Sequence, residues 1–315
     1  MSLARNRARL RFVPTVTWPL DGPLDLFQTL RPLVRGHGDR TIRLATGRAW
    51  LPMRTSAGPA TVHLRVDGPR LVGEAWGPGA EVALERAPRI VGIGVDGPVR
   101  PPLPDVYPLV TQLARRFPGI RMSRTEAVMD VLVPAILEQK VTGFEARRAW
   151  QGLVRRYGEP APGPAEVGLR LPPTAAKLAA MPYYAYHPFG VEQRRADVVR
   201  RVASRADWFE GIVDLPLPEA HARLQAVPGI GPWTAAEVAV RALGDQDAVS
   251  VGDFHLPNLV AWALAGEPRG DDARMLELLE PYRGQRALVM RLLELGGPRP
   301  PKYGPRLSPR GIEGI

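Results

Sequence analysis

The sequence predicts an α+β fold in two parts: an N-terminal α+β domain built on an antiparallel sheet, and an all-α domain that follows it. Residues 14–100 alternate apolar and polar side chains between frequent Gly and Pro breaks, which is the pattern of antiparallel strands. Residues 101–296 instead repeat apolar side chains with the 3.6-residue period of amphipathic helices. A chain of 315 residues is long enough for each part to bury its own core.

Within the first part, two stretches predict strands and two predict helices. The stretches 41–55 (TIRLATGRAWLPMRT) and 60–77 (ATVHLRVDGPRLVGEAWG) show period-2 alternation, and VDGP at 66–69 predicts a turn inside the second. The stretches 23–34 and 79–91 have the helical period. We therefore expect an antiparallel sheet flanked by helices.

Beyond a Pro-rich connection at 95–107, the helical period dominates, and helix stops such as Gly158 and Gly244 separate the segments. The helical segments are 124–141, 142–158, 191–209, 218–227, 232–244, 258–266, 274–282 and 284–297. The ends of the chain differ from both parts. Residues 1–13 form a basic arm, and residues 297–315, rich in Pro, Gly and Arg, predict a disordered basic tail.

The composition excludes several classes of protein. Cysteine is absent, which excludes a disulfide framework, a thiolate nucleophile, an iron–sulfur cluster and cysteine-ligated zinc. The five histidines are scattered and show no spacing typical of a metal site. No apolar run approaches the roughly 20 residues that cross a bilayer, and the Arg-rich start leads into no secretory signal. We expect a cytoplasmic protein without membrane contact.

The net charge of +10 and the pI of about 10.5 favour a polyanionic partner. A GC-rich coding sequence is an alternative cause, because arginine is abundant while lysine appears only at Lys140, Lys177 and Lys302. Charge alone therefore leaves nucleic-acid binding open.

The stretch LQAVPGIGPWTA combines features of an anion site. Gly229 and Gly231 permit positive φ and close backbone approach, and Pro232 suits the first position of a helix. Backbone amides beside a helix N-terminus, with the Thr234 hydroxyl in its first turn, would bind a DNA phosphate without reading a base. The alternative is an ordinary turn between two helices.

With VGDFHLP about twenty residues later, the pattern VPGIGPWTA resembles the signature of the helix-hairpin-helix superfamily of base-excision DNA glycosylases. The resemblance extends over residues 14–296, with the hairpin at 218–243, and the N-terminal part is similar to the extra domain of the 3-methyladenine DNA glycosylase II branch. It implies a helix-hairpin-helix glycosylase domain at 101–296. It also implies a monomeric, nucleoid-associated enzyme of base excision repair, which flips an alkylated purine out of double-stranded DNA and hydrolyses its N-glycosidic bond.

Asp253 matches the catalytic carboxylate of that superfamily. Cleavage of a deoxyribosyl bond develops positive charge on the sugar, which an ionised carboxylate stabilises. The alternative is that Asp253 only caps the following helix, although Pro257 lacks the N–H that a cap would use there. Trp233 occupies the position at which other members of the superfamily carry a Schiff-base lysine, and no lysine lies between residues 178 and 301. A monofunctional enzyme without β-lyase activity is therefore implied.

The resemblance also implies a base pocket, with Trp233 and Phe254 as aromatic walls that attract a cationic alkylpurine. Two pocket aromatics of the family are replaced here, one by Glu237 and one by Arg291. The alternatives are core packing for the two aromatics and an exposed pair with Arg241 for Glu237.

Gln139 and Lys140 match the wedge that fills the gap left by a flipped base, although lysine is a poor apolar wedge. The family hairpin also binds a monovalent cation, Na⁺ or K⁺, which here would use the backbone carbonyls of Gln225, Val227 and Ile230. No other cofactor is expected.

Two further functions stay open at this point. One is a non-catalytic helix-hairpin-helix DNA-binding protein, and the other is a glycosylase for a different damaged base. Asp253 discriminates against the first, because a carboxylate repels phosphate by roughly 1 kcal/mol at about 4 Å even in water. Glu237 and Arg291 keep the second open.

Overall fold

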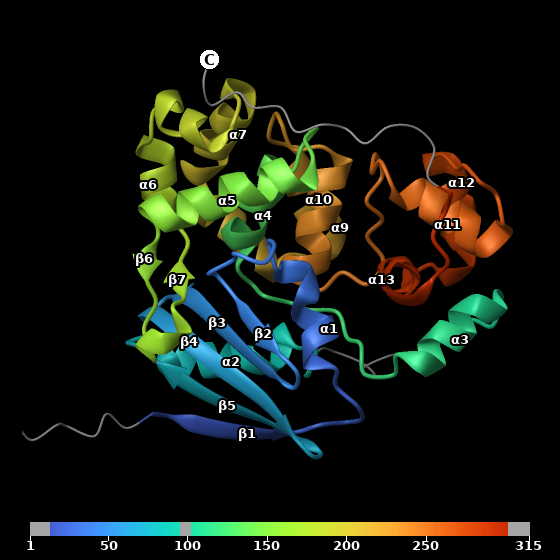
Figure 1. Cartoon of the computed structure of the whole chain (residues 1–315), viewed down its shortest axis with the longest axis horizontal. Coiled ribbons are helices and arrows are strands. Elements are labelled where there is room, and N and C mark those ends of the chain that lie inside the picture. Colours follow the sequence, from blue (N-terminus) through green and yellow to red (C-terminus); the bar gives the residue numbers. More distant parts are fainter. Residues whose placement is uncertain (1–12, 95–101, 302–315) are drawn as a thin grey trace, which may run out of the picture.

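The computed structural model describes residues 13–94 and 102–301. Residues 1–12 of the predicted arm, 95–101 of the Pro-rich connection and 302–315 of the predicted tail lie outside the described residues. The first part of the chain is a five-stranded antiparallel sheet in the order β1-β5-β4-β3-β2, with helices beside it (Figure 1). Its elements are β1 (Thr15–Pro19), α1 (Leu26–Leu30), η1 (Arg31–Leu33), β2 (Arg43–Ala45), β3 (Arg48–Thr55), β4 (Gly58–Asp67), β5 (Arg70–Trp76) and α2 (Ala80–Ile90).

The predicted turn at residues 66–69 is confirmed. It joins β4 to β5, and Asp67 pairs with Arg70 in the antiparallel register. Alternate residues of these strands, such as Val62 and Leu64, are buried against α2. The apolar residues of the alternating pattern that predicted the strands thus form the core of this part.

The second part is helical, with a 3₁₀ or π turn at several helix ends. Its helices are α3 (Pro108–Arg116), α4 (Val128–Leu137), α5 (Gly143–Tyr157), α6 (Ala175–Ala180), α7 (Gln193–Ala203), α8 (Ala206–Glu210), α9 (Leu217–Gln225), α10 (Pro232–Val238), the π-helical η6 (Ala239–Leu243), α11 (Leu256–Ala265), α12 (Asp272–Leu279) and α13 (Arg286–Gly296). One detail departs from the all-α prediction: β6 (Glu159–Pro160) and β7 (Arg170–Leu171) form a short antiparallel ladder.

The helical part contains two hydrophobic cores. One lies between α4, α5, α7 and the hairpin helices, and the other between α3 and α11–α13. Val240 packs against both cores. The helix α1 of the N-terminal part lies between the sheet and the helices (Figure 1), so three separately packed bodies meet in this region.

Among the described residues, no helix is long and apolar enough to cross a membrane. Over the same ranges, no three histidine, aspartate or glutamate side chains come together as a metal site.

Candidate active site

The turn between α9 and α10 requires glycine at one of its two glycine positions. Gly229 has φ +101°, and a Cβ built there would lie 2.4 Å from Cγ2 of Val198 on α7. Gly231 has φ −95° and open space around its Cα. Only Gly229 therefore uses the positive φ that glycine permits, whereas the exposed backbone of Gly231 leaves room for close approach. Pro232 is the first residue of α10, as predicted.

The Thr234 hydroxyl does not point to solvent. Thr234 is 2% exposed, and its Oγ1 accepts a hydrogen bond of 2.9 Å from Nε2 of Gln139. The same Nε2 donates to the carbonyl oxygen of Gly229 at 2.9 Å. The prediction of a phosphate contact through Thr234 is therefore wrong, because this hydroxyl joins the hairpin to the end of α4. Gln139, predicted at the DNA gap, is the partner that makes this link.

Lys140 is exposed and has φ +54°, an uncommon backbone conformation for a residue with a side chain. The loop that carries it ends at Thr142, which caps α5. The Thr142 hydroxyl accepts from the backbone N–H of Glu145, and the Glu145 carboxylate accepts from the N–H of Thr142 at 2.8 Å. The Lys140 side chain is thus presented from a loop that is fixed at both ends, by Gln139 and by the cap. Its role as a wedge stays a prediction.

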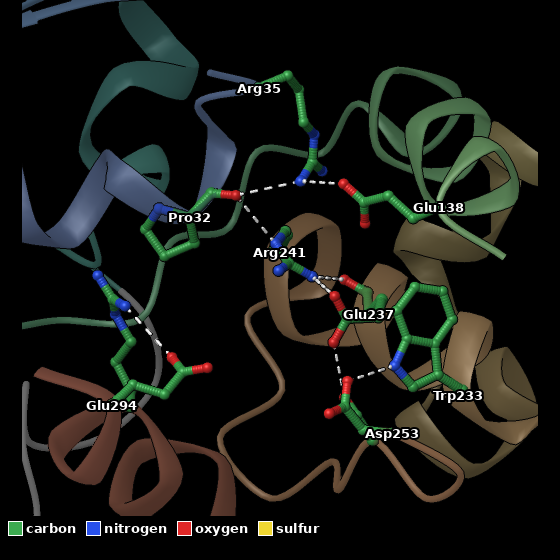
Figure 2. A network of polar contacts seen from close by, with 10 residues as sticks. Pro32, Arg35, Glu138, Trp233, Glu237, Arg241, Asp253 and Glu294 are labelled. Carbon is green, nitrogen blue, oxygen red and sulfur yellow. Dashed lines mark hydrogen bonds and ion pairs between the residues drawn. The ribbon is translucent and has the colours of Figure 1, made fainter. Parts of the chain in front are cut away.

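The Asp253 carboxylate accepts three N–H hydrogen bonds. Its Oδ2 accepts from Nε1 of Trp233 at 3.0 Å, a contact that Figure 2 shows directly. Its Oδ1 accepts from the backbone N–H of His255 at 2.7 Å and of Leu256 at 2.9 Å. The carboxylate is therefore held in one orientation from both sides and is only partly buried.

The same contacts show that Asp253 also caps a helix. Leu256 is the first residue of α11, and the carboxylate satisfies its otherwise free N–H. The objection based on Pro257 is wrong, because the cap uses the two amides that precede this proline. Capping and catalysis are thus compatible roles of one side chain.

Glu237 lies one helical turn from Trp233, and both of its oxygens are engaged. One accepts from the Ser250 hydroxyl at 2.7 Å, and the other forms an ion pair with Arg241 (Figure 2). The carbonyl of Ser250 in turn accepts the N–H of Asp253 at 3.1 Å. The predicted pairing with Arg241 is confirmed, but it is not exposed, since the Glu237 side chain is only 13% accessible.

A cavity of about 70 Å³ lies beside this cluster. Glu237 and Arg291 both line it, together with Ser250 and with Thr29 and Pro32 from the N-terminal part. No aromatic ring lines it.

Two of the three arginines that line the cavity, Arg241 and Arg291, are largely shielded from solvent and paired with carboxylates. Arg291 forms an ion pair of 3.3 Å with Glu294 and donates to the carbonyl of Gln28 at 3.1 Å, while burial lowers the pKa of Arg291. For Arg241, burial opposes the charge, but Glu237 and other carboxylates outweigh this effect and raise the pKa. Arginine does not deprotonate in proteins, so both guanidiniums place a positive charge in the cavity wall.

Phe254 is 76% exposed and makes an edge-to-face contact with His255, with 5.0 Å between ring centroids. The alternative of core packing is therefore wrong for this residue. Its ring is an exposed aromatic face next to Asp253.

The site for a monovalent cation at the hairpin stays a prediction. The Val227 carbonyl accepts the N–H of Ile230 at 3.0 Å, and a carbonyl oxygen has a second lone pair for an ion. The carbonyls of Gln225, Val227 and Ile230 would then hold Na⁺ or K⁺ and stiffen the turn.

The sequence reading missed three contributors to this site. Ser250 joins Glu237 to the Asp253 backbone, Arg201 donates to the Pro228 carbonyl of the hairpin at 2.7 Å, and Arg35 reaches Glu138 from the N-terminal part. A serine three residues before the aspartate was a usable signal. Nothing in the pattern identified the two arginines, because their partners are distant in sequence or are backbone carbonyls.

Comparisons with known proteins give both sequence relatives and structural neighbours. A probable bifunctional transcriptional activator/DNA repair enzyme AlkA of Mycobacterium tuberculosis is 30% identical over 142 residues, which is 45% of this chain and 28% of that protein. DNA-3-methyladenine glycosylase 2 of Escherichia coli is 28% identical over 176 residues, which is 55% of this chain and 60% of that protein. The chain thus matches less than two thirds of the length of either relative. No protein-family model matches it.

Solved structures share the fold over most of the chain. A 3-methyladenine DNA glycosylase from Archaeoglobus fulgidus has a TM-score of 0.71 at 17% identity, over 89% of this chain and 97% of that one. An 8-oxoguanine glycosylase/lyase from Clostridium acetobutylicum, bound to double-stranded DNA, has a TM-score of 0.59 at 14% identity, over 86% of this chain and 90% of that one. These likenesses establish the common α+β and helical architecture.

Proposed function

From the resemblance in sequence and fold to the helix-hairpin-helix DNA glycosylases, which the comparisons bear out, we propose that this chain is a DNA glycosylase that hydrolyses the N-glycosidic bond of a damaged base. The observation that carries the proposal is the Asp253 carboxylate, which three N–H donors orient beside the hairpin. Two residues close to it in the chain, Ser250 and Leu256, line the cavity. A binding surface alone does not need a charge fixed in this way.

The reaction follows from this geometry. The bond between C1′ and the base nitrogen breaks with its electron pair moving to the base, and positive charge develops on the sugar. The Asp253 carboxylate stabilises that charge and orients a water molecule. The water oxygen bonds to C1′, its proton leaves with the solvent or the base, and an abasic site remains.

In this proposal the hairpin binds the DNA backbone. The exposed backbone at Gly231 receives one phosphate, and the exposed cations Lys140 and Arg201 lie on segments that contact the hairpin. Lys140 then enters or borders the gap of the flipped nucleotide. The net charge of +10 supports the same partner.

The names of the sequence relatives point to alkylated purines as the first substrates to test. The exposed ring of Phe254 offers a stacking face for an electron-poor base close to the carboxylate. The absence of lysine between residues 178 and 301 supports a monofunctional enzyme, with Trp233 in the place of a Schiff-base lysine. Strand cleavage at the abasic product by the purified protein would contradict that part of the proposal.

The deciding experiment compares the wild type with Asp253→Asn in release of free base from alkylated duplex DNA, with DNA affinity measured in parallel. The amide keeps an oxygen acceptor for the α11 amides and removes the charge, and it also replaces the oxygen that accepts from the Trp233 indole with an NH₂ group. We expect release to fall by about 100-fold or more with affinity retained. Asp271→Asn is the matched control, because Asp271 caps α12 through the N–H of Arg274 in the same manner.

A non-catalytic DNA-binding protein is the second candidate, and one observation favours it. Asp253 has a structural reason to exist, since it caps α11. Tight, salt-dependent DNA binding with no base release from alkylated, oxidised or deaminated duplexes would establish this alternative. Release from only the oxidised or deaminated duplexes would instead establish a glycosylase for a different base.

A further inference from the structure

The N-terminal part of the chain enters the candidate site through one short segment, residues 28–35. Thr29 and Pro32 of this segment line the cavity beside Asp253. Three of its backbone carbonyls accept hydrogen bonds from side chains of three different helical elements. These pairs are Gln28 with Arg291 at 3.1 Å, Pro32 with Arg241 at 3.1 Å, and Arg35 with Gln151 at 2.7 Å.

In the contact made by the Arg35 side chain, the N-terminal part supplies the donor and the helical part the acceptor. Its Nη1 donates to Oε1 of Glu138 at 3.2 Å and lies 3.5 Å from the Pro32 carbonyl (Figure 2). The Arg35 side chain is 9% exposed and that of Glu138 is 24% exposed, so the pair is largely shielded from solvent. Glu138 directly precedes Gln139, which joins the end of α4 to the hairpin, and Lys140, the predicted wedge.

The Pro32 carbonyl is the point where two sets of contacts meet. On one side it accepts from Arg35, which holds Glu138 at the end of α4. On the other side it accepts from Arg241, which holds Glu237 in the cavity wall. Arg241 lies in the π-helical turn η6, a type of turn that is frequent at functional sites.

We propose that Arg35 is a positioning residue. Through it, the N-terminal domain fixes the position of residues 138–142, the wedge loop that carries Lys140, relative to the cavity wall that carries Glu237. This inference rests on the proposed glycosylase function and assigns the N-terminal domain a part in it. The physical reason is that both carboxylates are held by guanidiniums that share one rigid acceptor, the carbonyl of a proline in a 3₁₀ turn. The wedge loop and the cavity wall therefore cannot shift independently while the pairs are intact.

The alternative is a purely structural role for the ion pair. Removing one member of a buried pair leaves the other charge uncompensated and destabilises the fold, whereas replacing both members with apolar side chains is often neutral. A single substitution would therefore not distinguish a loss of positioning from a loss of stability of the fold. The double substitution does.

The test uses Arg35→Met and the double variant Arg35→Met, Glu138→Met in the full chain. Arg54→Met is the control, because Arg54 also crosses between the domains, to Glu159 at 3.2 Å and to the Pro172 carbonyl at 2.9 Å, but lies outside the cavity lining. The measurements are the single-turnover rate of base release, the affinity for duplex DNA containing an abasic site, and the unfolding temperature.

We expect the double variant to regain the unfolding temperature of the wild type and to release base about 10-fold more slowly. The Arg54→Met variant should stay within 2-fold of the wild-type rate. A double variant with both wild-type stability and the wild-type rate would overturn the proposal, as would an equal loss of rate in Arg54→Met. Base release that is absent from the wild type would count against the proposed function instead.

Amide hydrogen exchange decides the positioning without any substrate. In the double variant, exchange should become faster in both the C-terminal turn of α4 and residues 232–243, and Arg54→Met should leave both unchanged. Unaltered exchange in residues 232–243 of the double variant would overturn the proposal even if no lesion is ever released.

Discussion

Substituting Gly229 with alanine should disable the hairpin, whereas the same change at Gly231 should leave it folded. The two glycines stand one residue apart in the same turn, but only Gly229 has positive φ, at +101°. Its missing Cβ is also the space that Val198 occupies, since a Cβ there would lie 2.4 Å from Cγ2 of that residue. Gly231 has neither restriction.

Two terms set the size of the effect. A residue with a side chain in a sparsely populated backbone conformation costs about 1–3 kcal/mol. Overpacking against Val198 adds about 1–3 kcal/mol. We therefore expect Gly229→Ala to lower the free energy of unfolding by about 2–6 kcal/mol, and Gly231→Ala to change it by less than about 1 kcal/mol.

The assay is urea unfolding of the two variants, together with DNA affinity measured over a series of salt concentrations. Adding Val198→Ala to Gly229→Ala should recover the stability that is lost to overpacking and leave the cost of the backbone conformation. In contrast, Gly231→Ala should weaken DNA binding in a folded protein, because the methyl group stands where a phosphate approaches. Equal stability of Gly229→Ala and Gly231→Ala would refute the reasoning about the turn.

Three further outcomes follow from individual contacts. Trp233→Phe removes the indole donor to Asp253 and should slow single-turnover base release by about 10- to 100-fold, as expected for one hydrogen bond to a charged group. Burial, and after it the charge of Glu210, raises the pKa of Asp130 from 3.8 to about 7. The wild type should therefore lose unfolding free energy as the pH rises from about 4 to about 7, by at most a few kcal/mol. Unfolding experiments at pH 5 and pH 8 should show this loss in the wild type and not in Asp130→Asn. Thr142→Ala removes the cap of α5 and should cost about 1 kcal/mol of unfolding free energy.

Periodicity predicted the two-part architecture but not every element, since β1, α3 and α6 lie outside the stretches that it identified. Apolar and polar residues alternate along the strands because one face of the sheet is buried against α2. Each helical segment likewise buries one stripe of apolar side chains, which gives the helical period. The division of the helical part into two cores was not predictable, because a period shows that a helix has an apolar face but not which neighbour covers it.

The site was predictable only where the residue type is rare or its spacing unusual. Asp253 and the hairpin stood out as a lone acid and a glycine pair. The hydroxyl of Thr234 was assigned to phosphate because sequence shows an available donor, whereas its burial depends on Gln139, which lies 95 positions earlier. Likewise, Gly231 resembles Gly229 in sequence and differs from it only in φ.

The domain interface could not be predicted for a different reason. Its side chains donate mostly to backbone carbonyls, as Arg241 does to Pro32 and Arg291 to Gln28. Every residue carries a carbonyl, so no residue type marks the acceptor. Charge pairing is visible in a sequence, but an arginine that ends on a distant main-chain oxygen is not.

The indole of Trp233 links the two halves of the proposed chemistry. It belongs to the first turn of α10, two residues after the exposed backbone of Gly231, and its Nε1 orients the Asp253 carboxylate. A phosphate at the hairpin and the charge that acts on the sugar are therefore joined through one rigid side chain. Because each residue advances a helix by about 100°, a shift of one position in α10 would turn the indole away from Asp253. In the proposed mechanism, the close spacing of Gly231, Pro232 and Trp233 would set the position of a bound phosphate relative to the Asp253 carboxylate.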